Sequence, residues 1–240
     1  MGTVPIVLRV AACLLLPTAV FFGQDTSRLT PPANKTIKVA FLLGEGATMA
    51  DFTGPWEVFQ DVMISGNGKA IRSHHEMMSD AKLSQPFQLY TMAGSKAPIT
   101  VSGGMKIVPD YTFADAPKPN VIVIPAQRST REAIEWVKKN EPQTDVTMSV
   151  CTGAFLLART GLLDGGKATT HHWFQDDLER EFKNLSVERG VRFVENGKTA
   201  TSAGVASGTD LALHVVERHF GRDIAVATAE YMEYESVRWK

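Results

Sequence analysis

Two residues could carry chemistry in this sequence, Cys151 and Asp51. Cys151 follows an apolar run at residues 145–150 and precedes Gly153, after which a helical pattern begins. This pattern predicts a strand that turns directly into a helix. Unpaired amides and the helix dipole at such a junction favour an anion, so we expect a depressed pKa for the Cys151 thiol. The same amides could stabilise an oxyanion, and the small residue Gly153 would let a substrate approach closely. The chemistry indicated is nucleophilic catalysis by cysteine.

Asp51 lies just beyond the first apolar strand, at residues 37–43. In a parallel sheet the carboxyl ends of the strands share one edge, so Asp51 and Cys151 are expected to meet there. A carboxyl group beside the thiol could relay a proton. Asp51 could equally cap the helix that Thr53 and Pro55 predict, and the two roles are compatible. Thr152, next to the nucleophile, could position a water or intermediate, or only satisfy local amides.

The elements that must position these residues alternate along the chain. Short apolar strands alternating with helices predict an α/β domain with a mostly parallel sheet covered on both faces. Residues 65–84 are mixed in pattern and stay unassigned. The strands are expected at residues 37–43, 87–92, 106–108, 121–124, 145–150 and 199–202, and the helices from residue 53 and at residues 129–139, 154–159 and 204–220.

Length and charge restrict the classes of function. The chain has 240 residues, 44% of them hydrophobic, which fits a single domain with a real core. The formal net charge is −1, with 25 basic and 26 acidic side chains, so there is no basic excess for nucleic-acid binding. His74 and His75 are adjacent and lack further ligand spacing, so no metal is expected, and no cofactor motif is present.

The N-terminus has the layout of an export signal. One positive residue, Arg9, precedes an apolar run that is too short for a comfortable bilayer span. We expect residues 1–23 to be a signal peptide or N-terminal anchor, residues 24–35 a linker, and residues 36–240 the domain. The domain would then be exported, to a bacterial periplasm or outside the cell, with no other membrane contact. Cys13 lies in the leader, which leaves one thiol and no disulfide in the domain.

Four ordered sequence blocks are residues 39–59 with Ala-Asp-Phe-Thr-Gly-Pro-Trp-Glu, residues 149–158 with Val-Cys-Thr-Gly-Ala, residues 168–171 with Ala-Thr-Thr-His, and residues 201–211 with Ser-Gly-Thr-Asp. Together these blocks resemble the ThiJ/PfpI family. This resemblance implies a flavodoxin-like three-layer sandwich in a single domain that binds a small-molecule substrate and often forms a homodimer. The match is greatest to isonitrile hydratase-type members and to the sensor domains of AraC-type regulators.

The resemblance also implies roles for the candidate residues. In hydratase-type members, a carboxylate and a cysteine at the positions of Asp51 and Cys151 carry catalysis, and the threonine at Thr152 assists. The implied reaction adds water to an isonitrile and gives an N-substituted formamide. Many relatives have Gly-Gly where this chain has Ala126-Gln127, next to the expected oxyanion pocket. Gly153 and His171 are expected to line the same pocket.

Other functions stay open at this stage. A non-catalytic ligand-binding module and an oxidative-stress thiol sensor could use the same fold. Peptidase activity is disfavoured, because peptidase-like relatives place histidine directly after the cysteine and this chain has Thr152 there. The chain ends at Lys240, so a downstream helix-turn-helix domain is not expected. Residues 65–84 could form a lid, a dimer contact or a surface insertion.

Overall fold

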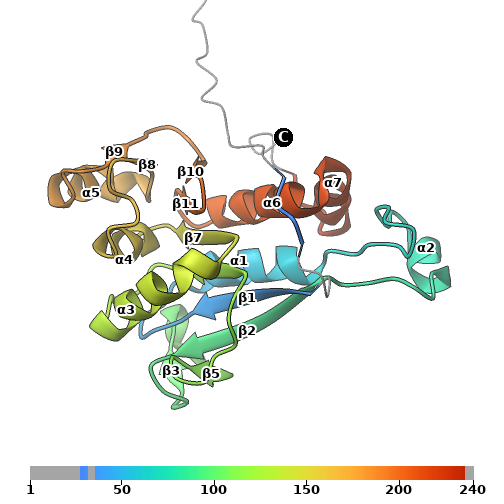
Figure 1. The fold of residues 1–240 in the computed structure, drawn as a ribbon, viewed down its shortest axis with the longest axis horizontal. Helices are drawn as coiled ribbons and strands as arrows, with labels where there is room; N and C mark the ends of the chain where they lie inside the picture. Colours follow the sequence, from blue (N-terminus) through green and yellow to red (C-terminus); the bar gives the residue numbers. More distant parts are fainter. Residues whose placement is uncertain (1–27, 32–35, 236–240) are drawn as a thin grey trace, which may run out of the picture.

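The computed structural model describes residues 28–31 and 36–235, and a seven-stranded sheet lies at its centre (Figure 1). The strand order is β10-β11-β7-β6-β1-β2-β5, and only β10 runs antiparallel to its neighbour. The predicted α/β class with a mostly parallel sheet is confirmed. The strands are β1 Ile37–Leu42, β2 Phe87–Ala93, β5 Tyr111–Thr112, β6 Val121–Ile124, β7 Val146–Val150, β10 Phe193–Asn196 and β11 Thr199–Ser202. The small two-stranded sheets pair β3 Ile99–Thr100 with β4 Lys106–Ile107, and β8 Lys167–Ala168 with β9 Ser186–Val187.

Helices cover both faces of the sheet. Successive side chains of a strand point to opposite faces, so each central strand feeds two cores. Val39 and Phe41 of β1 join one core with α1, α6 and α7, whereas Ala40 and Leu42 join the other with α3 and α4. The helices are α1 Met49–Gln60, α2 His74–Ser79, α3 Arg131–Asn140, α4 Gly153–Arg159, α5 Gln175–Glu181, α6 Ser207–Phe220 and α7 Arg222–Tyr231, with 3-10 turns at Ser102–Gly104, Glu141–Gln143 and His172–Phe174.

Helix α1 begins earlier than its local sequence indicates. The predicted start near Thr53 is wrong, because the helix already begins at Met49 and holds Pro55 in its interior. The N–H of Met49 donates to Ser102 Oγ at 2.8 Å, a cap that comes from a distant segment and that no local pattern could reveal. Asp51 therefore lies in the first turn of the helix. The N-cap position, for which Asp51 was a candidate, is occupied by Thr48.

Helices α1 and α6 approach each other closely beside the end of β7. A methyl group at Gly54 would lie 2.7 Å from Thr209 Oγ1, and one at Gly208 would lie 2.9 Å from the Val150 side chain. Such distances leave no room for a side chain at either glycine. The two helices are thus locked against the strand that ends at Cys151, and both contribute to the surroundings of that residue.

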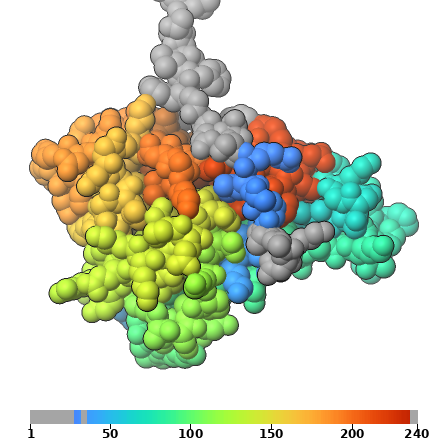
Figure 2. All heavy atoms as spheres, in the orientation of Figure 1, coloured from blue at the N-terminus to red at the C-terminus, as the bar shows by residue number. Residues whose placement is uncertain are grey.

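Residues 61–86 join the end of α1 to the start of β2, at the amino edge of the sheet. In Figure 1 the segment around α2 projects beyond the amino ends of β1 and β2, and it also stands out in the space-filling view (Figure 2). Of the three sequence interpretations of residues 65–84, a lid over Cys151 is wrong, because the thiol lies at the opposite, carboxyl edge. None of the residues of α2 is buried.

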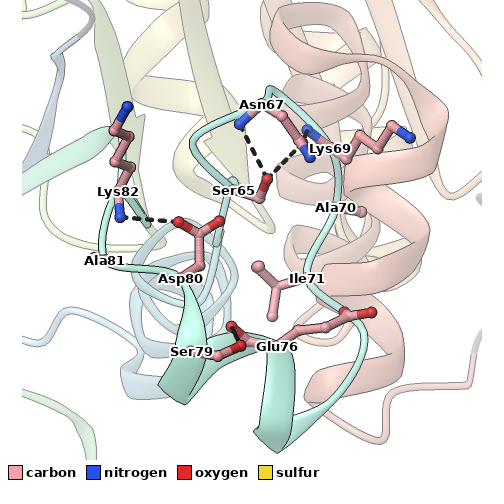
Figure 3. A pocket seen from close by; sticks show the side chains of 10 residues that line it. All are labelled: Ser65, Asn67, Lys69, Ala70, Ile71, Glu76, Ser79, Asp80, Ala81 and Lys82. Atoms are coloured by element: carbon pink, nitrogen blue, oxygen red, sulfur yellow. Dashed lines mark hydrogen bonds between the residues drawn. The ribbon is translucent and has the colours of Figure 1, made fainter.

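Short polar contacts hold this insertion together. Ser65 Oγ and Asn67 form hydrogen bonds at the first turn, and Asp80 accepts from the N–H groups of Gly66 at 3.0 Å and Lys82 at 2.9 Å (Figure 3). Arg72 ties the insertion to α7 through ion pairs with Asp223 and Glu230. The insertion is therefore attached to the domain by exposed polar groups and by a few apolar side chains, Ile64, Ala70 and Ile71.

The antiparallel strand β10 forms one end of the sheet and carries a buried charge. The Glu195 side chain is fully buried, and its carboxylate pairs with Arg218 and, at 2.8 Å, with His214, both on α6. A buried carboxylate is tolerable only with such partners. At the other end of the sheet, β5 is only two residues long.

The described part of the N-terminal segment packs on the domain. Leu29 lies against the core, and its N–H donates to the Arg218 carbonyl at 2.8 Å. The leader predicted at residues 1–23 lies outside the described residues. Within the described part of the chain, no helix is long and apolar enough to cross a membrane.

Candidate functional site

Cys151 occupies a strained turn between β7 and α4. Its φ of +57° is in the left-handed region, which a residue with a side chain adopts rarely. The N–H of Cys151 donates to the Ala203 carbonyl at 3.1 Å, which ties the turn to the end of β11. The side chain is 7% exposed. The predicted abrupt strand-to-helix junction is therefore present, and it places the sulfur at the carboxyl edge of the sheet.

Gly153 is required by packing rather than by access to the sulfur. A methyl group there would lie 2.2 Å from the Ile124 carbonyl oxygen and 2.8 Å from that of Pro125. The open side of the glycine, expected to admit a substrate, is filled by the backbone after β6. The glycine allows α4 to start directly against this backbone, and this start is what bends the chain at Cys151.

Asp51 faces the thiol from the first turn of α1. It is fully buried, and its Oδ2 accepts the N–H of Ala126 at 3.0 Å. Burial raises the pKa of Asp51 to about 6, against the opposing effects of the Ala126 N–H and of Cys151. Oδ1 makes no hydrogen bond of ordinary length within the described residues. The carboxyl and the thiol are thus close enough for each to shift the pKa of the other.

The thiol itself is held in its protonated form. Burial raises the pKa of Cys151 to about 11, and the negative charge of Asp51 adds to this effect, while the N–H groups of Thr152 and Val205 oppose it. The expected depression of the thiol pKa is therefore wrong. Two amides and the dipole of the seven-residue helix α4 do not outweigh burial beside a carboxylate. At neutral pH the negative charge of the pair is therefore mainly on Asp51.

Ala126 and Gln127 support the site in a way the sequence did not indicate. The Ala126 N–H is taken by Asp51, and its carbonyl accepts the N–H of Thr48 at 2.8 Å. The Gln127 side chain donates through Nε2 to the Leu42 carbonyl at 2.8 Å. Both residues were expected to line an oxyanion pocket. The structure shows that the polar groups of Ala126 and the side-chain amide of Gln127 hold α1 and β1 beside β6, and this arrangement fixes Asp51. That the two residues line an oxyanion pocket stays a prediction.

Thr152 directly follows Cys151, whereas His171 lies against the loop after β11. Thr152 flanks α4 and makes no side-chain cap, while its N–H faces the sulfur. His171 is half-buried against the loop after β11, since a methyl group at Gly204 would lie 2.5 Å from His171 Cδ2. The neighbouring Thr170 Oγ1 donates to the Cys151 carbonyl at 2.8 Å. His171 Nδ1 accepts the N–H of Trp173 at 3.3 Å, so this ring nitrogen is engaged within its own turn.

Val205 is the site residue that sequence reasoning missed. Its N–H faces the Cys151 sulfur, and its φ of +33° is an outlier for a β-branched residue. The same conformation delays the start of α6 to Ser207, where the sequence predicted residue 204. Within residues 28–31 and 36–235, no group of three or more His, Cys, Asp or Glu is arranged to hold a metal ion.

Comparison with known proteins identifies the family. The model of the DJ-1/PfpI family matches residues 37–218, which include the turn at Cys151 and the carboxyl of Asp51. The chain belongs to the DJ-1/PfpI family. The resemblance to ThiJ/PfpI proteins seen in the sequence is therefore confirmed.

Relatives within the DJ-1/PfpI family differ in what they do. The chain is 26% identical over 204 residues to the isonitrile hydratase of Pseudomonas putida, a match covering 82% of this chain and 78% of the relative. It is 27% identical over 157 residues to the transcriptional regulator GbdR of Pseudomonas aeruginosa, covering 63% of this chain but only 42% of the regulator. A ThiJ/PfpI family protein from Pseudomonas syringae has a similar structure, with a TM-score of 0.67, 25% identity and coverage of 84% of this chain and 76% of that one.

Proposed function

We propose that this protein is a cysteine-dependent enzyme that adds water to an isonitrile and releases an N-substituted formamide. The observation that carries the proposal is the buried Asp51 carboxyl facing the Cys151 sulfur at the carboxyl edge of the sheet. The likeness to isonitrile hydratase over most of both chains supports the same reaction. A nucleophile beside a carboxyl base is the arrangement that this addition requires.

The first step joins the thiol to the substrate. As the sulfur attacks the terminal carbon of the isonitrile, Asp51 accepts the thiol proton and delivers it to that carbon, which gives a thioimidate, R–N=CH–S–Cys151. At neutral pH most Asp51 side chains are ionised, because their pKa is about 6, so the base is ready. The high pKa of the thiol means that proton transfer accompanies the attack instead of preceding it.

The second step releases the product. Water adds to the thioimidate carbon through its oxygen, and one of its protons passes through Asp51 to the nitrogen. The C–S bond of the resulting tetrahedral adduct then breaks, the hydroxyl proton returns to the sulfur, and R–NH–CHO leaves. The N–H groups of Thr152 and Val205 face the sulfur and favour its negative charge as the bond breaks. Net change is the addition of one water.

The test is hydration of tert-butyl isonitrile and benzyl isonitrile by the purified protein, followed by NMR detection of the formamide. Cys151→Ala is expected to abolish turnover, and Asp51→Asn to reduce it by about 10²–10⁴-fold, the range for loss of a general base. Thr170→Val, which removes a contact to the Cys151 carbonyl without removing a reacting group, serves as a fold-matched comparison. Full turnover by Cys151→Ala would end the proposal.

A ligand-binding module is the second candidate, favoured by a specific observation. The thiol pKa near 11 leaves the sulfur protonated, and the Ala126 N–H is already taken by Asp51. A site of this kind can bind a small molecule without reacting, and GbdR is a regulator, although the matched region is under half of its length. Calorimetry with isonitriles and formamides would then show binding without turnover. The same raised pKa disfavours an oxidation sensor, since peroxide reacts with thiolates.

A homodimer in solution belongs to the same proposal. The proposed partners of this chain are a second copy of itself and a small electrophilic substrate. Sedimentation velocity on the purified domain tests it, and a monomer at every concentration would remove this part of the proposal without affecting the reaction.

A further inference from the structure

Three residues other than glycine adopt a left-handed conformation among the described residues. They are Cys151 at φ +57°, Val205 at +33° and Glu233 at +51°. Such conformations cost free energy and persist only where the surroundings enforce them. The first two belong to the site. The third lies 82 positions after Cys151 in the chain, so its strain calls for a structural reason.

Glu233 forms the turn that ends α7. Its N–H donates to the Glu230 carbonyl at 3.1 Å, and the N–H of Tyr234 donates to the Ala229 carbonyl at 2.9 Å. These two bonds make a Schellman motif, in which the strained position normally holds glycine. The turn reverses the chain after the helix. Its effect is to direct the side chain of Tyr234 back towards the start of α6.

Tyr234 meets the loop that carries Val205. Its Oη lies 3.1 Å from Asp210 Oδ1 and 3.4 Å from the Ala206 carbonyl oxygen. A phenol has one proton, so the two acceptors share it, with Asp210 the nearer. Asp210 is fully buried in the first turn of α6, and Ala206 directly follows Val205. The hydroxyl thus joins the C-terminal side of the loop to the helix behind it.

Arg192 holds the other side of the same loop. Its guanidinium pairs with Asp210 Oδ2, and its carbonyl accepts the N–H of Ala203 at 2.9 Å. Ala203 in turn accepts the N–H of Cys151. Residues 203–206 are therefore clamped at both ends by one buried carboxylate, Asp210, through Arg192 on one side and Tyr234 on the other.

We infer that Tyr234 is a positioning residue for Cys151, because it closes the clamp that keeps Val205 in its left-handed conformation with the N–H directed at the sulfur. The inference rests on the proposed function only in taking Cys151 as the reactive group. The aromatic ring of Tyr234 also packs against the core, so a role in stability has to be separated from this one. Removal of the hydroxyl alone makes the separation.

The experiment compares Tyr234→Phe with Tyr231→Phe. Tyr231 lies on α7 and is 55% exposed. The substitution Tyr231→Phe removes the same hydroxyl group at a position away from the loop. The rate of Cys151 alkylation by iodoacetamide is measured from pH 7 to 11, together with the free energy of unfolding. Tyr234→Phe is expected to slow alkylation roughly three- to tenfold at each pH below the thiol pKa, less than loss of a whole hydrogen bond to a charged group would give. Tyr231→Phe is expected to match the unmodified protein.

A Tyr234→Phe profile that overlies that of the unmodified protein would overturn the inference, as would an equal slowing in Tyr231→Phe. Glu233→Gly provides a second variant, since glycine takes the same turn without strain and should keep the alkylation rate unchanged. Alkylation does not depend on isonitrile turnover. A protein that shows the Tyr234 effect but hydrates no isonitrile would retain the positioning role and lose the proposed function.

Discussion

The two edges of the sheet are built in opposite ways. At the carboxyl edge, Cys151 and Asp51 are buried. They are held by strained backbone and by hydrogen bonds with Ala126, Thr170 and Ala203. At the amino edge, residues 65–84 are mostly exposed and held by local hydrogen bonds and by Arg72. Strained backbone and close packing are typical of places where an atom must be held in a precise position. The difference indicates which edge performs the chemistry.

The largest expected difference between the edges concerns glycine. Gly153→Ala should destabilise the domain by more than about 3 kcal/mol or prevent folding, because its methyl group would overlap the backbone after β6. Gly68→Ala, in the insertion, meets open space and should cost only about 1 kcal/mol through its positive φ. Urea unfolding of both variants measures this. Equal costs would remove the contrast in packing.

The next effect concerns the carboxyl group at each edge, Asp51 in the site and Asp80 in the insertion. The pKa of Asp51 is raised from 3.8 to about 6, so its contribution to stability is fully present below pH 3.8 and lost as the pH rises through 6. Asp51→Asn should therefore stabilise the domain at pH 7.5 by up to about 3 kcal/mol and have little effect near pH 4. Thermal unfolding at both pH values tests this, and a loss of stability at pH 7.5 would contradict it.

Asp80 in the insertion should behave in the opposite sense. Hydrogen bonds from the Lys82 and Gly66 N–H groups lower its pKa, so it stabilises the fold above its ordinary pKa and ceases to do so as the pH falls. Asp80→Asn should lower the melting temperature slightly at neutral pH and not at pH 3. A gain in stability at neutral pH would show that the two edges do not differ in this respect.

The Asp51 carboxylate also separates reactivity from catalysis. Its negative charge raises the thiol pKa, so Asp51→Asn should lower that pKa and speed alkylation of Cys151 at pH 8 while slowing isonitrile hydration. Hydration by the unmodified protein should fall as the pH drops through about 6, where Asp51 takes up a proton. A pH–rate profile with no inflection between pH 5 and 7 would count against Asp51 as the base.

The smallest effect is expected from the attachment of the insertion. Arg72→Ala removes ion pairs to Asp223 and Glu230 that are exposed to solvent and should cost no more than about 1 kcal/mol. Turnover and Cys151 alkylation should stay within about twofold of the unmodified protein. A larger change in either rate would show that the amino edge communicates with the site.

Sequence patterns could predict the elements and the two principal residues of the site, for a physical reason. Buried strands such as Val121–Ile124 and the break at Cys151 are local, because apolar runs and small residues reveal them within a few positions. The thiol pKa was mispredicted because it depends on burial and on Asp51, 100 positions away along the chain. Val205 and Tyr234 leave no local signature either. Their importance arises from contacts among segments that only the fold brings together.

The ends of the sheet have a consequence for how copies of this protein can meet at high concentration. An unprotected outer strand invites another chain to pair with it and start aggregation. Here β10 carries the inward-pointing Glu195, neutralised by α6, and β5 has only two residues to offer. Neither end is a good template for strand addition. We therefore expect two copies of this protein to associate through surfaces formed by side chains rather than by fibre-like pairing of strand backbones.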